Sequence, residues 1–395
     1  MQIIFTGFPY PRGMAGTKRN EHAVRALKDE QGVKISILVS RQSTSLNPPA
    51  GIVDGVKYTT VMPDTLRAAF FLKYPLFFFR AQRLLKQMSS GENNSHTILY
   101  IYGPPSLDNI PLLCAAKRFG YRVVFDIVED DDLAYHISLS YWHKLNNGLV
   151  RFLTRLFLKR ADGIIVISSY LISKVQRMVE GKIPIHLRPV SVDSSCFQSR
   201  PKLYHDTLDL LYSGSFAMKD GVGVLIDAFE ALAGKYENVR LLMTGEPIDA
   251  GPILNRIERS KHKDRIVFLG YVSDRKYYDT IMMSDILCVP RVDLPYAHSG
   301  FPFKLGEFLA SGKPVVVSRT GDVEHYLRDF DSAMLVEPSS ADAIVNAVDF
   351  LVSNPESAVA IGRKGRDVAV TAFDYLAQCK GLFSFLKNVL SEHYD

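Results

Sequence analysis

Apolar residues in this chain gather in short runs that are separated by longer stretches of helical periodicity. Short runs rich in Val, Ile, Phe and Tyr are typical of strands in a parallel sheet with both faces buried. Such runs predict strands at 3–6, 34–40, 97–102, 122–128 and 163–168, and then at 209–213, 239–244, 265–269, 286–289, 314–318 and 333–336. Helical stretches lie between them, for example at 17–29 and 108–119. This alternation indicates the α/β class.

The two series of strands predict two Rossmann-like domains. A polar segment from 184 to about 205 separates them and is typical of an interdomain linker. We expect an N-terminal domain at 1–200, a C-terminal domain at 201–374, and a helix in 375–395 that packs back on the N-terminal domain. The loops at the carboxyl ends of both sheets are expected to face each other across a central cleft.

The composition agrees with a globular chain of two domains. Its 395 residues are 47% hydrophobic and 23% charged, which suffices for two sizeable cores. No uncharged apolar run is long enough to span a membrane, and residues 1–7 predict a strand rather than a signal peptide. The four cysteines match no metal-binding spacing, and Cys114 and Cys288 lie in apolar runs. They are expected to be buried free thiols, as in a reducing cytoplasm.

The strongest functional signal is the segment 298–318, which predicts a loop, a short helix and a buried strand. Ser299 and Gly300 precede a helix that should begin near Pro302, and the N-terminus of a helix favours a phosphate group. Glu307 is a carboxylate among apolar residues about one turn further on, where it could accept hydrogen bonds from a ribose diol. Together they predict a site for a nucleoside diphosphate. The alternative is an ordinary helix–strand unit with a surface glutamate.

A second phosphate loop follows the strand at 209–213. There Gly214, Ser215 and Lys219 precede a helix, in a spacing that fits neither a P-loop nor the dinucleotide fingerprint. Gly245 and Glu246 follow the next strand, and Arg291 follows the strand at 286–289. Parallel strands end at one edge of their sheet, so these residues are expected to surround one crevice. Each of them alone would more often be structural.

These motifs resemble the retaining glycosyltransferases of family 4, also called group 1, which have the GT-B fold. The resemblance covers about the whole chain and is strongest from 213 to 318; the segments 160–168 and 189–197 add to it. It implies two Rossmann-like domains whose parallel sheets face a central cleft. It also implies transfer of a sugar from a UDP- or GDP-sugar to a glycan or lipid-linked acceptor, in surface polysaccharide or glycoconjugate biosynthesis. Neither a cofactor nor a metal ion is expected.

The resemblance also assigns roles to residues. Glu307 would hold the ribose, while Lys219 and the amides of 300–303 would hold the diphosphate and stabilise the charge on the leaving group. The catalytic residues would be Glu129, Asp130, Ser299 and Lys219. The donor would be bound by Gly214, Ser215, Lys219, Gly245, Glu246, Arg291, Gly300, Phe301, Phe303, Lys304 and Glu307.

The chain departs from the family pattern at two places. Ser299 stands where the family usually has a first glutamate, and Asp293 is a candidate to replace it. The family's phosphate-binding arginine is absent before Lys219, and Arg291 or Lys304 could compensate.

The first half should bind the acceptor. Gly13, Gly16 and Thr17 lie in a loop after the first strand, which is expected near the cleft unless it is a plain βα turn. Glu129 or Asp130, after the strand at 122–128, is expected to bind or deprotonate the acceptor hydroxyl. The sequence Asp130-x-Asp132 also resembles the metal-binding motif of the other large glycosyltransferase fold. That fold has one nucleotide-binding domain and would not explain the segment 300–312.

Two stretches, 70–86 and 141–160, combine aromatic and basic residues. Helical spacing would place Arg151, Arg155 and Lys159 on one face and apolar residues on another, a pattern typical of peripheral contact with an anionic membrane. The expected location is therefore the cytoplasm, either free or at the inner face of the plasma membrane. The alternative is that the apolar faces pack on the sheet. The basic residues match no nucleic-acid-binding motif, so no nucleic-acid partner is expected.

Two other functions remain open. One is a nucleotide-sugar epimerase of the GT-B architecture, with residues 129–132 and His298 as its acid and base candidates. The other is a catalytically silent nucleotide-binding subunit of a glycosylation complex, which the loss of a carboxylate at Ser299 would favour.

Overall fold

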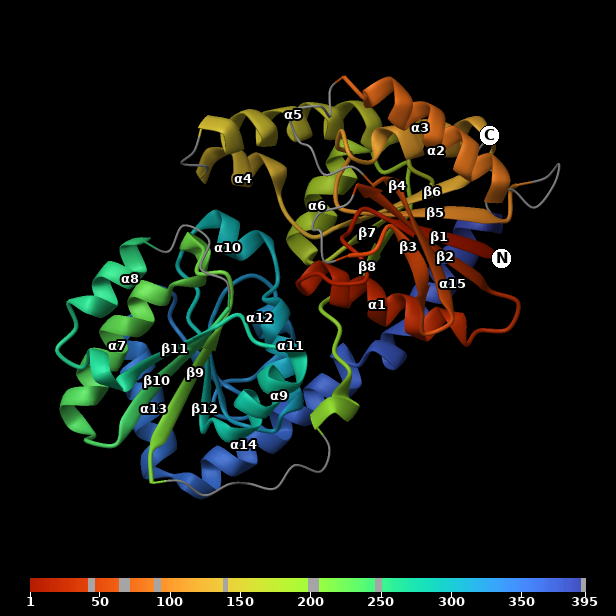
Figure 1. Cartoon of the computed structure of the whole chain (residues 1–395). Coiled ribbons are helices and arrows are strands. Elements are labelled where there is room, and N and C mark those ends of the chain that lie inside the picture. Colours follow the sequence, from red (N-terminus) through yellow and green to blue (C-terminus); the bar gives the residue numbers. More distant parts are fainter. Residues whose placement is uncertain are drawn as a thin grey trace. The chain divides into compact units, whose positions relative to one another are not determined.

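The computed structural model describes residues 1–41, 47–63, 72–88, 94–137, 141–197, 206–245 and 251–391 (Figure 1). The chain divides into two compact units, Met1–Pro189 with Gln378–Asp395, and Val190–Ala377. The division therefore falls at Pro189 and not at residue 200. The reason is that the chain pairs with the second unit directly after Pro189: the Val192 amide donates to the Phe373 carbonyl, and the Tyr375 amide donates to the Val192 carbonyl.

The first unit contains an eight-stranded sheet in the order β3-β4-β2-β1-β5-β6-β7-β8. All neighbouring strands are parallel except β3 and β4, which form an antiparallel pair. The strands are β1 (Gln2–Thr6), β2 (Lys34–Arg41), β3 (Ala50–Val53), β4 (Val56–Met62), β5 (Thr97–Tyr102), β6 (Arg122–Ile127), β7 (Gly163–Val166) and β8 (Ile185–Leu187). The helices are α1 (Ala15–Lys28), α2 (Tyr74–Met88), α3 (Ile110–Arg118), α4 (Asp131–Ile137), α5 (Tyr141–Phe157) and α6 (Ser169–Met178). The apolar runs of the sequence thus form central strands that are buried on both faces.

The second unit contains a six-stranded parallel sheet in the order β11-β10-β9-β12-β13-β14. Its strands are β9 (Leu208–Ser213), β10 (Val239–Thr244), β11 (Ile266–Gly270), β12 (Ile286–Val289), β13 (Val315–Ser318) and β14 (Met334–Val336). Its helices are α7 (Val222–Lys235), α8 (Gly251–Glu258), α9 (Asp274–Met283), α10 (Pro295–Ser299), α11 (Phe303–Ala310), α12 (Val323–Tyr326), α13 (Ala341–Ser353) and α14 (Pro355–Val368). The apolar sides of α7 and α13 pack together on one face of this sheet (Figure 1).

The last helix, α15 (Tyr375–Ser391), packs on the first unit from Gln378 onward. Its Phe385 ring stacks on His186 of β8 with ring centroids 5.2 Å apart. A side chain at Gly163 would lie 2.8 Å from Val389, so the glycine permits the close approach of this helix to β7. None of the helices in the described part of the chain is long and apolar enough to cross a membrane.

All four cysteines are free thiols. Cys288 on β12 is buried as expected, but Cys114 is only partly buried. The reason is its place on α3, where the residues on either side of it turn toward the core instead.

Candidate functional site

The residues singled out by the sequence in the second half meet at the carboxyl edge of the second sheet. Gly214 follows β9 and Gly245 follows β10, and the two loops touch. A Cβ atom at Gly245, where φ is +135°, would lie only 1.9 Å from the Gly214 carbonyl oxygen. Glycine is therefore required at Gly245 by both space and conformation. Glu246 lies outside the described residues.

Lys304 supplies a positive charge at this edge. Its Nζ lies 3.8 Å from Oδ1 of Asp220 and 4.3 Å from the centre of the Tyr212 ring. Burial lowers the pKa of Lys304 to about 8, with a further contribution from nearby arginine and lysine charges and an opposing one from Asp220. Lys304 is thus a desolvated cation whose pKa lies close to neutral pH, and it is a suitable partner for phosphate.

Asp220 organises the loop that follows β9. Burial alone would raise its pKa, but the neighbouring cations, Lys304 first, lower it, so Asp220 is ionised. The hydroxyls of Tyr212 and Ser215 both donate to its Oδ2 at 3.1 Å. Ser215, predicted to bind the donor, is therefore engaged in holding its own loop. Asp220 was not predicted as a site residue.

Lys219 and Arg291 both contact α10. The Nζ of Lys219 sits 4.3 Å from the centre of the Tyr296 ring. Arg291 is buried, and its Nη1 donates to the Ala297 carbonyl at 2.9 Å. Arg291 therefore supports the backbone of α10, whereas Lys219 adds a second cation to this edge.

The loop before α11 is mostly packed into the protein. Ser299 is 1% exposed, and its hydroxyl donates to the Tyr296 carbonyl at 3.0 Å. The Phe301 ring packs against Tyr326 and Phe373, so its side chain belongs to the core. Gly300 and Pro302 lead into α11, which begins at Phe303, close to the predicted start. This loop can thus offer backbone amides, while its side chains face inward.

Glu307 is partly buried on α11 and hydrogen-bonded. The Tyr277 hydroxyl donates to its Oε2 at 2.8 Å. Tyr277 was not predicted as a site residue, because no local pattern distinguishes it from other polar residues of α9. Asp293, the candidate replacement for the missing glutamate, is exposed and pairs with Nε2 of His298 at 2.9 Å. Since the Gly321 amide donates to Nδ1 of His298, the Nε2 of this ring carries the proton.

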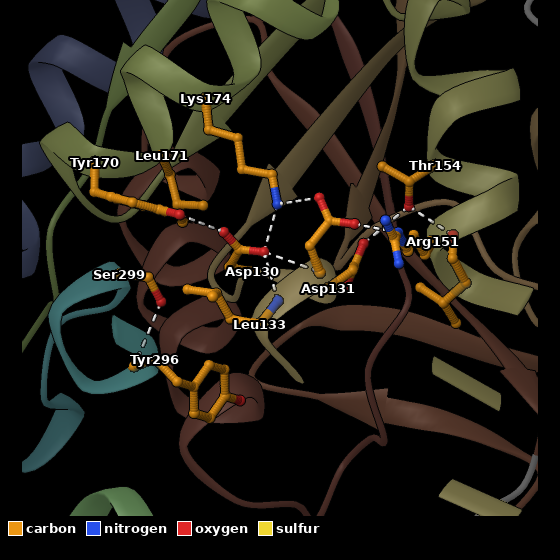
Figure 2. Close-up of polar contacts among 12 residues, drawn as sticks. Asp130, Asp131, Leu133, Arg151, Thr154, Tyr170, Leu171, Lys174, Tyr296 and Ser299 are labelled. Carbon is orange, nitrogen blue, oxygen red and sulfur yellow. Dashed lines mark hydrogen bonds and ion pairs between the residues drawn. The ribbon is translucent and has the colours of Figure 1, made fainter. Parts of the chain in front are cut away.

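In the first unit, Asp130 caps a helix. It is 2% exposed, and its Oδ1 accepts hydrogen bonds from the amides of Asp132 and Leu133 at the start of α4. Its carboxylate also accepts from the Tyr170 hydroxyl at 2.9 Å and forms an ion pair with Lys174 (Figure 2). The structure therefore engages Asp130 in fixing α4 and leaves Glu129 as the exposed carboxylate of the two.

The next two carboxylates, Asp131 and Asp132, line a pocket between α4, α5 and α6, as Glu129 and Asp130 do. Burial raises the pKa of Asp131 to about 6, and the Thr154 hydroxyl donates to it at 2.9 Å. Asp132 pairs with Arg151 and, at 2.8 Å, with Lys174. Lys174 thus lies between Asp130 and Asp132, the position that a cation would take in a metal-binding Asp-x-Asp motif. Among the described residues, no group of three or more His, Cys, Asp or Glu side chains is arranged to hold a metal ion.

The glycine loop after β1 is tightly packed. The Thr17 hydroxyl donates to the Pro9 carbonyl at 2.8 Å and closes the loop onto α1. A Cβ atom at Gly13 would lie 1.9 Å from the Thr17 hydroxyl, and one at Gly16 would lie 2.7 Å from the Tyr102 ring. Gly13 therefore allows the loop to lie against α1. Gly16 and Thr17 belong to the first turn of α1 rather than to the loop, and Gly16 allows that helix to approach β5.

The apolar face of α5 is only partly covered within the first unit. Leu153 is buried, whereas Tyr141, Phe152 and Leu156 are 75%, 61% and 50% exposed. The helix thus presents aromatic and aliphatic side chains to solvent beside Arg155. On α2, Phe77, Ala81 and Leu85 form a buried stripe, whereas Leu76 and Phe79 are 40% and 63% exposed. The stretch 64–71 before it lies outside the described residues.

The architecture is that of the GT-B glycosyltransferases, as comparison with solved structures shows. Over 99% of both chains, the structure is similar to sucrose-phosphate synthase from Thermosynechococcus elongatus, with a TM-score of 0.76 at 17% identity. It is also similar to Anabaena HepE in complex with UDP and glucose, with a TM-score of 0.75 at 14% identity, over 98% of this chain and 100% of that one. At these identities the likeness shows the fold.

Residues 197–368 match the profile of the family Glycosyl transferases group 1, so this part of the chain is similar to the members of that family. Among curated relatives, an MMP alpha-(1->4)-mannosyltransferase of Mycolicibacterium hassiacum is 26% identical over 192 residues, 48% of this chain and 45% of the relative. A GDP-mannose-dependent alpha-(1-6)-phosphatidylinositol dimannoside mannosyltransferase of Mycobacterium tuberculosis is 31% identical over 147 residues, 37% of this chain and 36% of the relative. The matched part of the chain thus spans less than half of the length of these relatives.

Proposed function

We propose that this protein is a retaining glycosyltransferase that transfers a hexosyl group from a UDP- or GDP-sugar to a glycan or lipid-linked sugar, in surface polysaccharide or glycoconjugate biosynthesis. The observation that carries the proposal is that Lys304 and Glu307 lie three residues apart on α11, at the carboxyl edge of β9. Residues three apart lie on one side of a helix, so a cation for the diphosphate and a carboxylate for the ribose face the same region. Relatives named as GDP-mannose-dependent enzymes and a neighbour solved with UDP support this class of donor.

In this proposal the donor is bound and activated by the side chains and amides of the second unit. Lys304, Lys219 and the first amides of α11 would bind the diphosphate. As the bond to the sugar breaks, negative charge grows on the leaving diphosphate, and fixed cations in a partly desolvated site stabilise it. Two lysines thus supply the positive charge that a metal ion would otherwise supply, which is why we propose a reaction without a metal.

The acceptor is assigned to the first unit. Glu129 follows β6 as an exposed carboxylate, beside the capped start of α4. A carboxylate in that position can accept a hydrogen bond from an acceptor hydroxyl and receive its proton. The exposed aromatic side chains and basic residues of α5 support peripheral contact with an anionic membrane at the cytoplasmic face. Such contact would suit a lipid-linked acceptor.

One observation favours a second function, a nucleotide-binding subunit without catalytic activity. Ser299 occupies the place of the family's first glutamate, and its hydroxyl is buried against the Tyr296 carbonyl. The other carboxylate nearby, Asp293, is exposed and paired with His298.

Thermal unfolding with nucleotides tests the proposal. A ligand at about 100 times its dissociation constant adds about 2.7 kcal/mol to the free energy of unfolding. We expect UDP or GDP, but not ADP, to raise the melting temperature of the wild type, and the Glu307→Ala variant to lose this shift. Hydrolysis of the matching nucleotide-sugar by the wild type would then separate an enzyme from a silent subunit. The absence of a shift with every nucleotide would refute the donor site.

A further inference from the structure

Tyr277 connects the end of β9 to Glu307 through a series of side-chain hydrogen bonds. The Ser213 hydroxyl, at the end of β9, donates to the Tyr277 hydroxyl. The Tyr277 hydroxyl in turn donates to Oε2 of Glu307 at 2.8 Å. The three residues belong to β9, α9 and α11, so these hydrogen bonds join three elements that are distant in sequence.

The direction of these hydrogen bonds is fixed by their chemistry. Burial, together with the negative charge of Glu307, raises the pKa of Tyr277 well above its ordinary value. The phenol therefore keeps its proton throughout the range in which proteins work, and an ionised carboxylate can only accept. Tyr277 is thus a permanent donor to Glu307. Its own helix is anchored nearby, where the Tyr278 ring packs against Phe197 with centroids 5.2 Å apart.

A carboxylate that binds both hydroxyls of a diol must hold its two oxygens in a defined plane. A glutamate side chain has several rotatable bonds, and ordering them on binding costs conformational entropy. A donor fixed on one oxygen removes most of that freedom before the ligand arrives, which is the usual benefit of a preorganised site.

We propose that Tyr277 is a positioning residue for Glu307, and that it holds the carboxylate in the plane that accepts both ribose hydroxyls. It thereby sets the preference of the site for ribonucleotides over 2′-deoxyribonucleotides. The inference rests on the proposed function, because it requires Glu307 to bind the ribose of the donor.

The test is calorimetric titration with UDP and GDP, each compared with its 2′-deoxy analogue. The variant is Tyr277→Phe, which removes the hydroxyl and keeps the ring. The matched control is Tyr236→Phe, because Tyr236 donates to Oδ1 of Asp349 at the same 2.8 Å but lies at the far end of α7. We expect the wild type and the control to prefer the ribonucleotide by about tenfold, and Tyr277→Phe to prefer it by about threefold or less.

The outcomes separate this inference from the proposed function. If Tyr277 only joins α9 to α11, Tyr277→Phe should weaken the binding of the ribonucleotide and of its 2′-deoxy analogue equally. An unchanged preference in Tyr277→Phe would therefore overturn the inference but not the proposed function. If neither UDP nor GDP binds the wild type, the proposed function fails and the inference fails with it. Should Tyr277→Phe not fold, Ser213→Ala leaves Tyr277 in place and is expected to reduce the same preference by a smaller factor. A preference unchanged in Ser213→Ala would then count against the inference.

Discussion

Nζ of Lys304 lies 3.8 Å from Oδ1 of Asp220, although the two residues belong to different elements, α11 and the turn after β9. The pair holds the lysine at the edge of the sheet. It does not neutralise the edge, because Lys219 and Arg291 also act on Asp220 and lower its pKa. The loop therefore keeps an excess of positive charge, because its one carboxylate, Asp220, already interacts with these cations.

This excess of positive charge predicts a pH-dependent affinity for nucleoside diphosphates. The pKa of Lys304 is lowered to about 8, so Lys304 is charged below that pH and neutral above it. Affinity should fall by about tenfold between roughly pH 7 and pH 9, since a hydrogen bond to a charged group is lost. Titration calorimetry across this range measures it. Lys304→Arg stays charged and should show a flat profile, whereas a wild-type profile that is equally flat would exclude Lys304 from the phosphate site.

Gly214 should be required for nucleotide binding more than for folding. A Cβ atom there would lie 2.4 Å from the Tyr212 hydroxyl and 2.6 Å from Nζ of Lys304. Lys304 ends a flexible side chain, whereas Tyr212 is buried, so Gly214→Ala should displace the cation more than the tyrosine while the unit stays folded. We expect a loss of affinity of about tenfold for UDP or GDP, comparable to the loss of one charged contact, with a smaller effect on the melting temperature.

The control for this substitution is Gly234→Ala on α7, where an added Cβ atom meets no neighbour. It should leave affinity unchanged and add about 0.5–1 kcal/mol of stability, because alanine is the better helix former. If Gly214→Ala binds nucleotide as the wild type does, the space in front of Lys304 is not part of the site.

The central strands could be predicted from the sequence because burial on both faces leaves a continuous apolar run. The pair β3 and β4 was missed, because β3 is an edge strand with exposed positions and gives no such run. The strand β8 was also missed, since it has only three residues inside a segment that otherwise indicates a linker. The domain boundary was misplaced for a similar reason: Val192 joins the second unit through Phe373, a contact that no local pattern encodes.

The candidate site could be predicted where it depends on a position along the chain. Glu307 was identified from a loop, a helix start and an isolated carboxylate, and Lys304 from the resemblance to the family. The roles of Asp220 and Tyr277 could not be predicted, since each is defined by a partner on a distant helix. For Asp130 the sequence showed an acidic residue after a strand, but could not show that the start of α4 would engage it.

The buried ion pair of Arg19 and Asp126 should dominate the stability of the first unit. The guanidinium of Arg19 donates to both oxygens of Asp126, at 2.9 and 3.0 Å, and Tyr100 donates to the same carboxylate at 2.6 Å. Asp126→Asn would leave Arg19 without its counter-charge in the core and should cost about 3–5 kcal/mol. Urea unfolding followed by tryptophan fluorescence measures this loss. Glu180→Gln removes an exposed ion pair instead and should leave the transition where it is; if Asp126→Asn does so as well, the buried pair contributes little.

The exposed face of α5 should determine whether the protein binds membranes. Phe152 and Leu156 are largely exposed beside Arg155, so the helix combines apolar area with positive charge. We expect the protein to sediment with vesicles that contain phosphatidylglycerol, to do so less as salt rises, and not to sediment with phosphatidylcholine alone. Phe152→Ser with Leu156→Ser should reduce the bound fraction several-fold, because the lost apolar area is what enters the interface. Ile52→Ser, at an equally exposed apolar position on β3, is the matched control and should bind as the wild type does. If the double variant sediments as much as the Ile52→Ser control does, the exposed side chains of α5 do not contact lipid.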